Sequence, residues 1–188
     1  MTDATALTPG EIAKIAARID RPVVLVGLMG VGKSTVGRRL AAMLGTDFVD
    51  VDDEIERAAD RTVSEIFEAH GEAYFRAGER RVIARLMEEA HGVIATGGGA
   101  FVDPETRALI LDQAIAVWLD CDIDTLVERT SRRNDRPLLR NGNAREILTD
   151  LKERRGAAYA EAQIHLVTDN GPHSETAQRI LEAIDAWL

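Results

Sequence analysis

The sequence predicts a single α/β domain built on a parallel sheet of five strands with helices on both faces. Five short apolar runs alternate with helical segments along the 188 residues, and this alternation is typical of right-handed crossovers between parallel strands. A glycine-rich loop joins the first apolar run to the helix after it. The length suits one domain with a sizeable core. We assign that domain to residues 21–188, preceded by a tail and a short amphipathic helix in residues 1–20.

The loop at residues 27–35, Gly-Leu-Met-Gly-Val-Gly-Lys-Ser-Thr, matches the phosphate-binding pattern G-x-x-x-x-G-K-[ST]. It lies between an apolar run at 23–26 and a helical pattern at 36–44, which is the context that the motif needs. Backbone N–H groups and the helix N-terminus favour phosphate, and we expect Lys33 to reach the β- and γ-phosphates and Ser34 to ligate Mg²⁺. The expected nucleotide contacts are Gly30, Val31, Gly32, Lys33, Ser34 and Thr35. A plain glycine-rich turn is the less favoured alternative.

A carboxylate pair ends the second predicted strand, which alternates from Phe48 to Asp52. On a strand, Asp50 and Asp52 share one face at a separation of about 6.5–7 Å. The carboxyl ends of parallel strands form the edge at which open α/β sheets bind ligands. The alternative is that one aspartate only caps a helix beginning near Asp53. Two carboxylates one strand from a phosphate loop favour a chemical role.

The central part of the chain predicts a long helix and a glycine-lined strand end. A capping box at Thr62 and Glu65 opens a helical region that runs to about residue 90, with a break or bend expected at Gly71 and at Gly78. Taken alone, Arg76 on this helix reads as a solvated surface residue. The third strand then ends in three glycines, residues 97–99, which suit either a wall close to a ligand or a tight turn.

The C-terminal part predicts two more strands and a candidate lid. Apolar runs at 115–119 and 164–167 are the fourth and fifth strands, and the alternation of the fifth indicates a sheet edge. Residues 132–143 are basic, contain proline and glycine, and lack a helical period. A loop of this length favours a lid over a solvated connector.

Composition narrows the class of protein. The hydrophobic fraction of 45% and the charged fraction of 29% are typical of a soluble globular protein, and no apolar run approaches a membrane span. The net charge of −9 argues against non-specific binding of nucleic acid. The single Cys121 is expected to be a buried, inert thiol, and the absence of a secretory signal pattern favours the cytoplasm. The four scattered histidines give no metal-ligand spacing.

Together, the motifs resemble the shikimate kinase family along essentially all of residues 21–188. The matching pieces are Gly27–Thr35, Phe48–Asp52, Phe75-Arg76, Gly97–Gly99, Arg136-Pro137-Leu138-Leu139, and Arg155 ahead of Tyr159. The resemblance implies a P-loop NTPase fold with strand order 2-3-1-4-5. It also implies that ATP and Mg²⁺ are used to phosphorylate the 3-hydroxyl of shikimate, with a substrate-binding part at about residues 52–90 and a mobile lid at about 131–143.

The resemblance also implies roles for individual residues. Asp52 would hold the reacting hydroxyl and take its proton, with Lys33 and Arg136 as the other catalytic residues. Asp50 would support Mg²⁺ beside Ser34. The remaining implied contacts are Arg76 and Arg155 on the shikimate carboxylate, Gly97, Gly98 and Gly99 along the pocket, Arg136 from the lid onto the phosphate, and Arg129 and Pro172 on the two sides of adenine.

Two departures from the family pattern stand out. Gly156-Ala157-Ala158 replace a segment that often contains proline, which leaves the course of that helix open, and the N-terminal helix is an extension. The rival functions are a gluconate kinase, a nucleoside monophosphate kinase and a non-catalytic nucleotide-binding regulator. The triple glycine and Phe75-Arg76 argue against the two kinases, and the paired carboxylates argue against the regulator. We expect a monomer that binds shikimate and ATP, without nucleic-acid or membrane partners.

Overall fold

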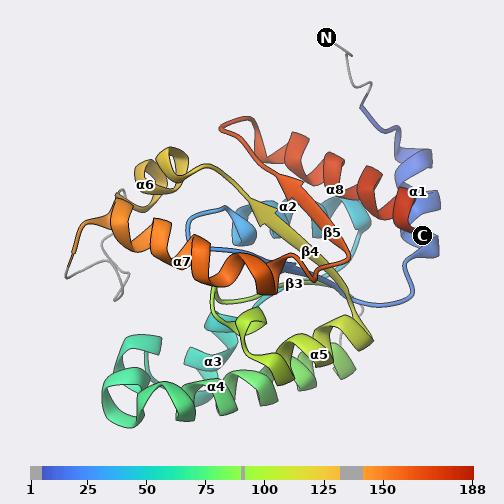
Figure 1. Ribbon diagram of the computed structural model, residues 1–188. Coiled ribbons are helices and arrows are strands. Elements are labelled where there is room, and N and C mark those ends of the chain that lie inside the picture. Colours follow the sequence, from blue (N-terminus) through green and yellow to red (C-terminus); the bar gives the residue numbers. More distant parts are fainter. Residues whose placement is uncertain (1–5, 90–91, 132–141) are drawn as a thin grey trace.

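A five-stranded parallel sheet in the order β2-β3-β1-β4-β5 forms the centre of the protein (Figure 1). The computed structural model describes residues 6–89, 92–131 and 142–188. In the sheet, Leu25 of the central strand pairs with Ala95 on one side and with Val117 on the other. The strands are β1 (Val23–Val26), β2 (Phe48–Asp50), β3 (Val93–Ala95), β4 (Ile115–Asp120) and β5 (Ile164–Val167). The predicted fold class and strand order are confirmed.

Helices cover both faces of the sheet because every connection between parallel strands crosses over it. Helices α1 (Pro9–Arg18), α2 (Lys33–Leu44) and α8 (His173–Trp187) pack together on one face. The opposite face carries α4 (Val63–Glu89), α5 (Pro104–Gln113) and α7 (Ala144–Tyr159) (Figure 1). The other helical elements of the described ranges are α3 (Val51–Ala59), η1 (Ala100–Val102) and α6 (Ile123–Ser131).

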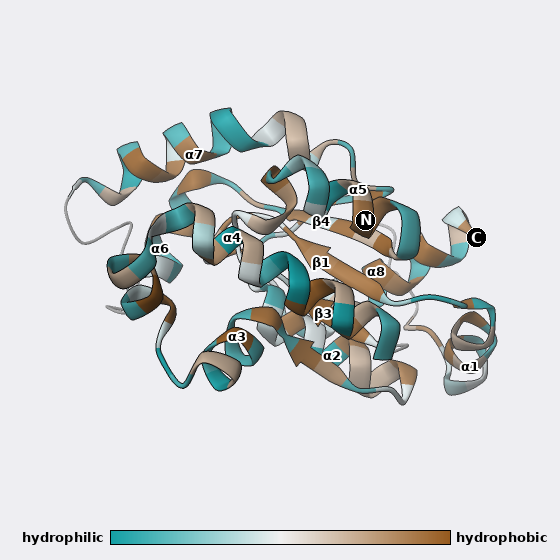
Figure 2. Cartoon of the chain, turned by 90° about the horizontal axis from the view of Figure 1, so that it is seen from below, coloured by the Kyte–Doolittle hydropathy of each residue, from teal (hydrophilic) through white to brown (hydrophobic). Residues whose placement is uncertain are grey.

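The apolar core follows the sheet, and strands β1, β3 and β4 are largely coloured as hydrophobic in Figure 2. All residues of β1 and β3 are buried, as expected for strands covered on both faces. In β5 buried and exposed residues alternate, so the prediction of an edge strand is confirmed. Cys121 is buried and has no disulfide partner. Within the described part of the chain, no helix combines the length and the apolar character needed to cross a membrane.

The predicted helix ends are largely observed. Thr8 with Glu11 and Thr62 with Glu65 both form the reciprocal hydrogen bonds of a capping box. Gly71 interrupts α4 with φ 80° and ψ 176°, which confirms the break expected there. The bend expected at Gly78 is wrong, because the helical backbone continues through this residue. One helical turn can accommodate an isolated glycine when the rest of the helix is packed.

The second strand is shorter than predicted, and this changes the geometry of the carboxylate pair. Strand β2 ends at Asp50, and α3 begins at Val51. The Asp50 side chain accepts a hydrogen bond from the backbone N–H of Asp52 at 3.1 Å and so forms the N-cap of α3. Asp52 therefore lies in the first turn of a helix, and the prediction that it shares a strand face with Asp50 is wrong.

Candidate active site

The phosphate-binding loop has the backbone that its glycines predict. Gly27 has φ +135° and Gly32 has φ +102°, a range that favours glycine. A Cβ atom at Gly27 would also collide with the carbonyl oxygen of Leu119. The Lys33 side chain is buried, and its Nζ donates to the carbonyl oxygens of Gly27 at 2.7 Å and Leu28 at 2.9 Å. The loop thus holds its lysine against its own backbone, beside the N-terminus of α2.

Ser34 and Asp50 meet at the start of α2. The Ser34 hydroxyl donates to Oδ2 of Asp50 at 2.5 Å, while Oδ1 of Asp50 caps α3. Among the described residues, no group of three or more His, Cys, Asp or Glu side chains could hold a metal ion. A Mg²⁺ ion that shares its coordination with substrate phosphates needs only one or two protein oxygens. The adjoining hydroxyl and carboxylate oxygens fit this requirement.

Arg129 lies against the phosphate-binding loop. Its guanidinium donates to the carbonyl oxygen of Val31 at 3.1 Å and to that of Asp169 at 2.7 Å. It also lies close to Gly32, since a Cβ atom placed on that glycine would be 3.8 Å from Nη1 of Arg129. Pro172 immediately precedes α8, three residues after Asp169. The two residues that the resemblance places around adenine therefore come from segments that meet beside the loop.

Asp52 is in an environment that opposes its ionised form. Burial raises the pKa of Asp52, and the negative charge of Asp50 raises it further, while Lys33 acts in the opposite direction; the resulting pKa is about 6. A carboxyl group with this pKa is mostly ionised at neutral pH and is a stronger base than an ordinary aspartate. These are the properties expected of a general base.

The three glycines bring the predicted acceptor-side residues together. A Cβ atom on Gly97 would lie 3.0 Å from Oδ1 of Asp52, and one on Gly98 would lie 3.2 Å from Nη1 of Arg155. A Cβ atom on Gly99 would collide with the guanidinium of Arg76. Side chains from α3, α4 and α7 thus converge on the backbone of residues 97–99, which we call the glycine wall. This backbone leaves no room for side chains of its own.

Glu79 is a residue of this site that the sequence analysis missed. It is 1% exposed, and its Oε2 accepts a hydrogen bond from Nη1 of Arg76 at 2.5 Å. Its Oε1 is buried without a hydrogen-bond partner in the described structure. Burial raises the pKa of Glu79, whereas the positive charge of Arg76 lowers it. A sequence signal existed, because Glu79 lies four residues from both Phe75 and Ile83, inside an apolar stripe.

Tyr159 fastens α7 to the glycine wall. Its hydroxyl donates a hydrogen bond to the carbonyl oxygen of Gly98, and burial raises the pKa of this hydroxyl against the opposing charge of Arg155. Arg155 lies one turn before Tyr159 on the same helix. The course of this helix, which the sequence left open, is continuous through Gly156 to Tyr159. Arg76 and Arg155 are both partly buried here, contrary to a solvated surface role for Arg76.

The remaining predicted site residue, Arg136, lies outside the described residues. Most of the candidate lid at 131–143 lies outside them as well. The described structure therefore contains the three glycines at residues 97–99 with the side chains that meet there, and the phosphate-binding loop, but it does not bear on Arg136.

Comparison with known proteins places this site in a family. The family model for shikimate kinase matches residues 29–185. The chain belongs to the shikimate kinase family. A shikimate kinase from Novosphingobium aromaticivorans is 60% identical over 99% of this chain and 98% of that protein. One from Caulobacter vibrioides is 56% identical over 87% of this chain and 82% of its own length. The predicted family, and with it the kinase class, is confirmed.

Solved structures agree with this assignment. A shikimate kinase from Acinetobacter baumannii, solved in complex with shikimate, superimposes with a TM-score of 0.87 at 38% identity, covering 92% of this chain and 97% of that one. A gluconokinase from Sinorhizobium meliloti gives a TM-score of 0.54 at 17% identity, a likeness of fold alone. The comparisons thus favour shikimate kinase over the gluconate kinase alternative.

Proposed function

We propose that this member of the shikimate kinase family transfers the γ-phosphoryl group of ATP to the 3-hydroxyl of shikimate, in the route to aromatic amino acids. The observation that carries the proposal is the convergence of Asp52, Arg76 and Arg155 on Gly97–Gly99, one strand from the phosphate-binding loop. Phosphoryl transfer needs positioning and charge neutralisation more than covalent chemistry, and this arrangement supplies both.

Asp52 is the proposed general base. With a pKa of about 6 it is available in the ionised form at pH 7, and it can accept a hydrogen bond from the 3-hydroxyl and then its proton. Its place in the first turn of α3 is fixed by the hydrogen bond from its own N–H to Asp50. The base is thus aimed by the backbone of a capped helix and not by a flexible loop.

Arg76 and Arg155 are the proposed clamp for the shikimate carboxylate. A guanidinium group offers a planar pair of donors that matches a carboxylate, and these two groups reach the glycine wall from different helices. Glu79 orients Arg76 through their 2.5 Å hydrogen bond. The second oxygen of Glu79 has no hydrogen-bond partner among the described residues, and we assign it to accept a hydrogen bond from an acceptor hydroxyl.

The nucleotide side is assigned to the phosphate-binding loop and its neighbours. The N–H groups of the loop and Lys33 hold the phosphates, and Lys33 exchanges its bonds with the loop carbonyls for phosphate oxygens. Ser34 and Asp50 hold Mg²⁺, which when bound neutralises charge on the β- and γ-phosphates. Arg129 and Pro172 flank adenine, and Arg136 contacts the transferred phosphoryl group by analogy with the family.

A coupled ADP-release assay with separate acceptors tests the function. We expect Mg²⁺-dependent ADP release with shikimate, and no release above background with gluconate or with nucleoside monophosphates. Phosphorus NMR of the product identifies the 3-phosphate ester. Release with gluconate alone would contradict the assignment, and a protein that binds ATP without turnover on any acceptor would favour a non-catalytic regulator.

We further propose that the enzyme is a cytoplasmic monomer. The single cysteine, which is buried, suits a reducing compartment. Light scattering after gel filtration should give the mass of one chain, 20.6 kDa. A mass twice as large would replace the monomer by a dimer without affecting the proposed reaction.

A further inference from the structure

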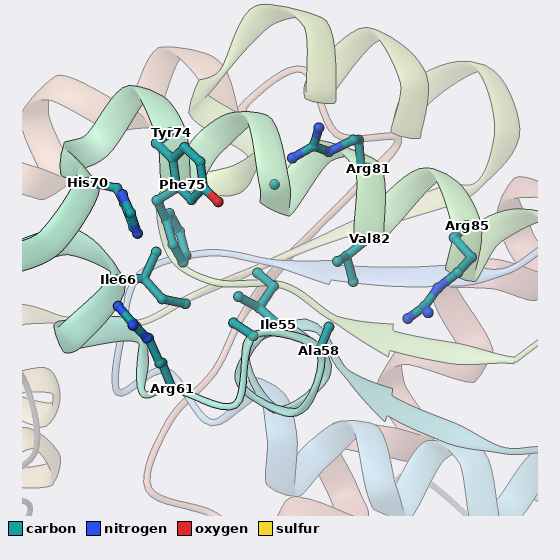
Figure 3. A pocket seen from close by; sticks show the side chains of 12 residues that line it. Ile55, Ala58, Arg61, Ile66, His70, Tyr74, Phe75, Arg81, Val82 and Arg85 are labelled. Carbon is teal, nitrogen blue, oxygen red and sulfur yellow. The ribbon is translucent and has the colours of Figure 1, made fainter.

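A cavity lies between α3 and α4, outside the candidate active site. Its volume is about 520 Å³, within the range of pockets that hold small organic ligands. Ile55, Ile66 and Phe75 form part of the apolar floor of the cavity. The side chains of Arg61, Arg81 and Arg85 line the cavity as well (Figure 3). The cavity therefore joins an apolar interior to several positive charges.

The cavity and the active site use different faces of α4. Gly78, Val82 and Arg85 line the cavity and recur at the spacing of one helix face. Arg76 and Glu79 turn toward the glycine wall instead. None of the residues assigned to the substrates lines the cavity. It is a separate site that shares a helix with the acceptor wall.

The charges around the cavity favour an anion. The chain as a whole carries a formal charge of −9, yet no acidic residue lines this cavity. Arg85 is paired with Glu54 at 3.0 Å, and the charge of Arg61 acts on the carboxylate of Glu65 and lowers its pKa, whereas Arg81 forms no salt bridge with any residue that the structure describes. Arg81, together with the further charges of Arg61 and Arg85, makes a local positive site beside an apolar floor on an otherwise acidic protein.

We propose that this cavity binds a small organic anion, a carboxylate or sulfonate attached to an aromatic or cyclic apolar body. The body packs on Phe75 and the aliphatic floor, and the acidic group pairs with Arg81. Arginine suits this role because its planar fork matches carboxylate and sulfonate oxygens.

The same aromatic ring connects the cavity to the carboxylate clamp. Phe75 lines the cavity, and the guanidinium carbon of Arg76 lies 5.2 Å from the centre of the Phe75 ring. The Phe67 ring packs on Phe75 as well, with ring centres 4.5 Å apart. A ligand that packs on Phe75 therefore acts on Arg76 through one side chain. This coupling to shikimate binding rests on the proposed function, whereas binding in the cavity does not.

Calorimetric titration with 2-naphthoate tests the binding, with shikimate present in excess to occupy the acceptor site. We expect 2-naphthoate to bind, and the neutral 2-naphthalenemethanol and the cationic 2-naphthylmethylamine to bind at least about tenfold more weakly, because they lack a charge-assisted bond. Equal affinity for all three compounds would overturn the proposal of an anion site.

Gly78 offers a matched pair of variants that locates the ligand. A Cβ atom on Gly78 would have no neighbour within 4 Å, and the helical backbone there suits other residues. Gly78→Met should fill the cavity and abolish naphthoate binding, whereas Gly78→Ala should retain it. Both variants should fold, because each replaces a helical glycine by a better helix former. Unchanged naphthoate affinity in Gly78→Met would place the ligand elsewhere and overturn the proposal.

Arg81→Ala and steady-state kinetics complete the test. Arg81→Ala should weaken naphthoate binding by about three- to tenfold, as for a partly solvated charged hydrogen bond.

Steady-state kinetics of the wild type test the coupling. Saturating naphthoate should change the KM for shikimate by about twofold or more and leave the KM for ATP unchanged, and Gly78→Met should remove this effect. Binding without any change in the KM for shikimate would overturn the coupling. Calorimetry does not depend on turnover, so failure of the proposed function gives a different result from failure of the cavity.

Discussion

The phosphate-binding loop and the proposed acceptor wall are assembled in different ways. The loop takes nine consecutive residues, 27–35, and works largely through backbone N–H groups held by the glycine conformations. The acceptor wall takes single side chains from α3, α4 and α7, which meet at residues 97–99. One contiguous segment therefore forms the phosphate-binding loop, whereas the acceptor wall forms only when tertiary packing brings separate helices together.

The two halves also differ in their charges. On the acceptor side, burial raises the pKa values of both Asp52 and Glu79, and this effect is opposed by Lys33 at Asp52 and by Arg76 at both carboxyl groups. On the phosphate side, the buried Lys33 is satisfied by two backbone carbonyls. The acceptor wall thus keeps carboxylates in an environment that works against their charge, which is characteristic of catalytic groups. The predictions below test whether this difference is functional, from the largest expected effect to the smallest.

Replacing Asp52, the proposed base, should have the largest effect on turnover. Asp52→Asn keeps the shape of the side chain but cannot accept a proton, so kcat should fall by about 10²–10⁴ while ATP affinity changes little. The neighbouring Asp53→Asn is the matched control, because the Asp53 side chain is 71% exposed. Steady-state kinetics on both variants decide the point, and near-normal turnover of Asp52→Asn would exclude Asp52 as the base.

The same variant should be more stable than the wild type at pH 7. The pKa of Asp52 is raised to about 6 in the fold, so its ionisation costs stability as the pH rises from about 4 to 6, and the cost persists above that range. Asparagine removes this cost, which should increase the free energy of unfolding by about 1–2 kcal/mol and the Tm by about 2–8 °C. An unchanged or lower Tm in thermal melts would contradict the unfavourable environment assigned to Asp52.

Removing either clamp arginine should affect one substrate only. Arg76→Ala and Arg155→Ala should each weaken shikimate binding by about ten- to hundredfold, the value of one charge-assisted hydrogen bond, and leave ATP binding nearly unchanged. Arg154→Ala is the control, since the Arg154 side chain is 74% exposed and adjoins Arg155 in sequence. Titration of each variant with both ligands is the measurement, and equal losses for shikimate and ATP would show a general structural effect.

The pH dependence of kcat/KM for shikimate should reveal the ionisation of Asp52. Because Asp52 must be ionised to act, kcat/KM for shikimate should fall about tenfold per pH unit below a pKa of about 6. ATP binding measured over the same range should not show this transition. A profile that stays flat to pH 5 would mean that no group with the raised pKa of Asp52 takes part in catalysis.

The smallest expected effect is that of Glu79→Gln. Glutamine keeps the size of the side chain and loses the charge that orients Arg76, so the KM for shikimate should rise by about three- to tenfold with a smaller change in kcat. Glu72→Gln is the control, because Glu72 contacts Arg76 from an exposed position at 3.5 Å. A similar shift in both variants would indicate that only the net charge around Arg76 matters.

This difference explains which parts of the fold and of the candidate site could be predicted from the sequence. The phosphate-binding loop, the parallel sheet and the capping boxes depend on residues a few positions apart, and the patterns predicted them. The position of Asp52 was misjudged because strand alternation at 48–52 does not reveal that the Asp50 carboxylate already caps a helix. Glu79 was missed because its role depends on Arg76 turning inward, which only the packed structure shows. Without the family resemblance, Arg76 reads as a surface residue.

Asp50 has a consequence for protein engineering. One of its oxygens accepts from Ser34 at the start of α2, and the other accepts from the N–H of Asp52 at the start of α3. The helix that carries Asp52, the proposed base, is therefore anchored to the same side chain as Ser34 of the phosphate-binding loop. A designer who transplants α3 and α4 from a relative to change acceptor specificity has to carry β2 with them. The boundary of an exchangeable module runs before Phe48, not at the first residue of the helix.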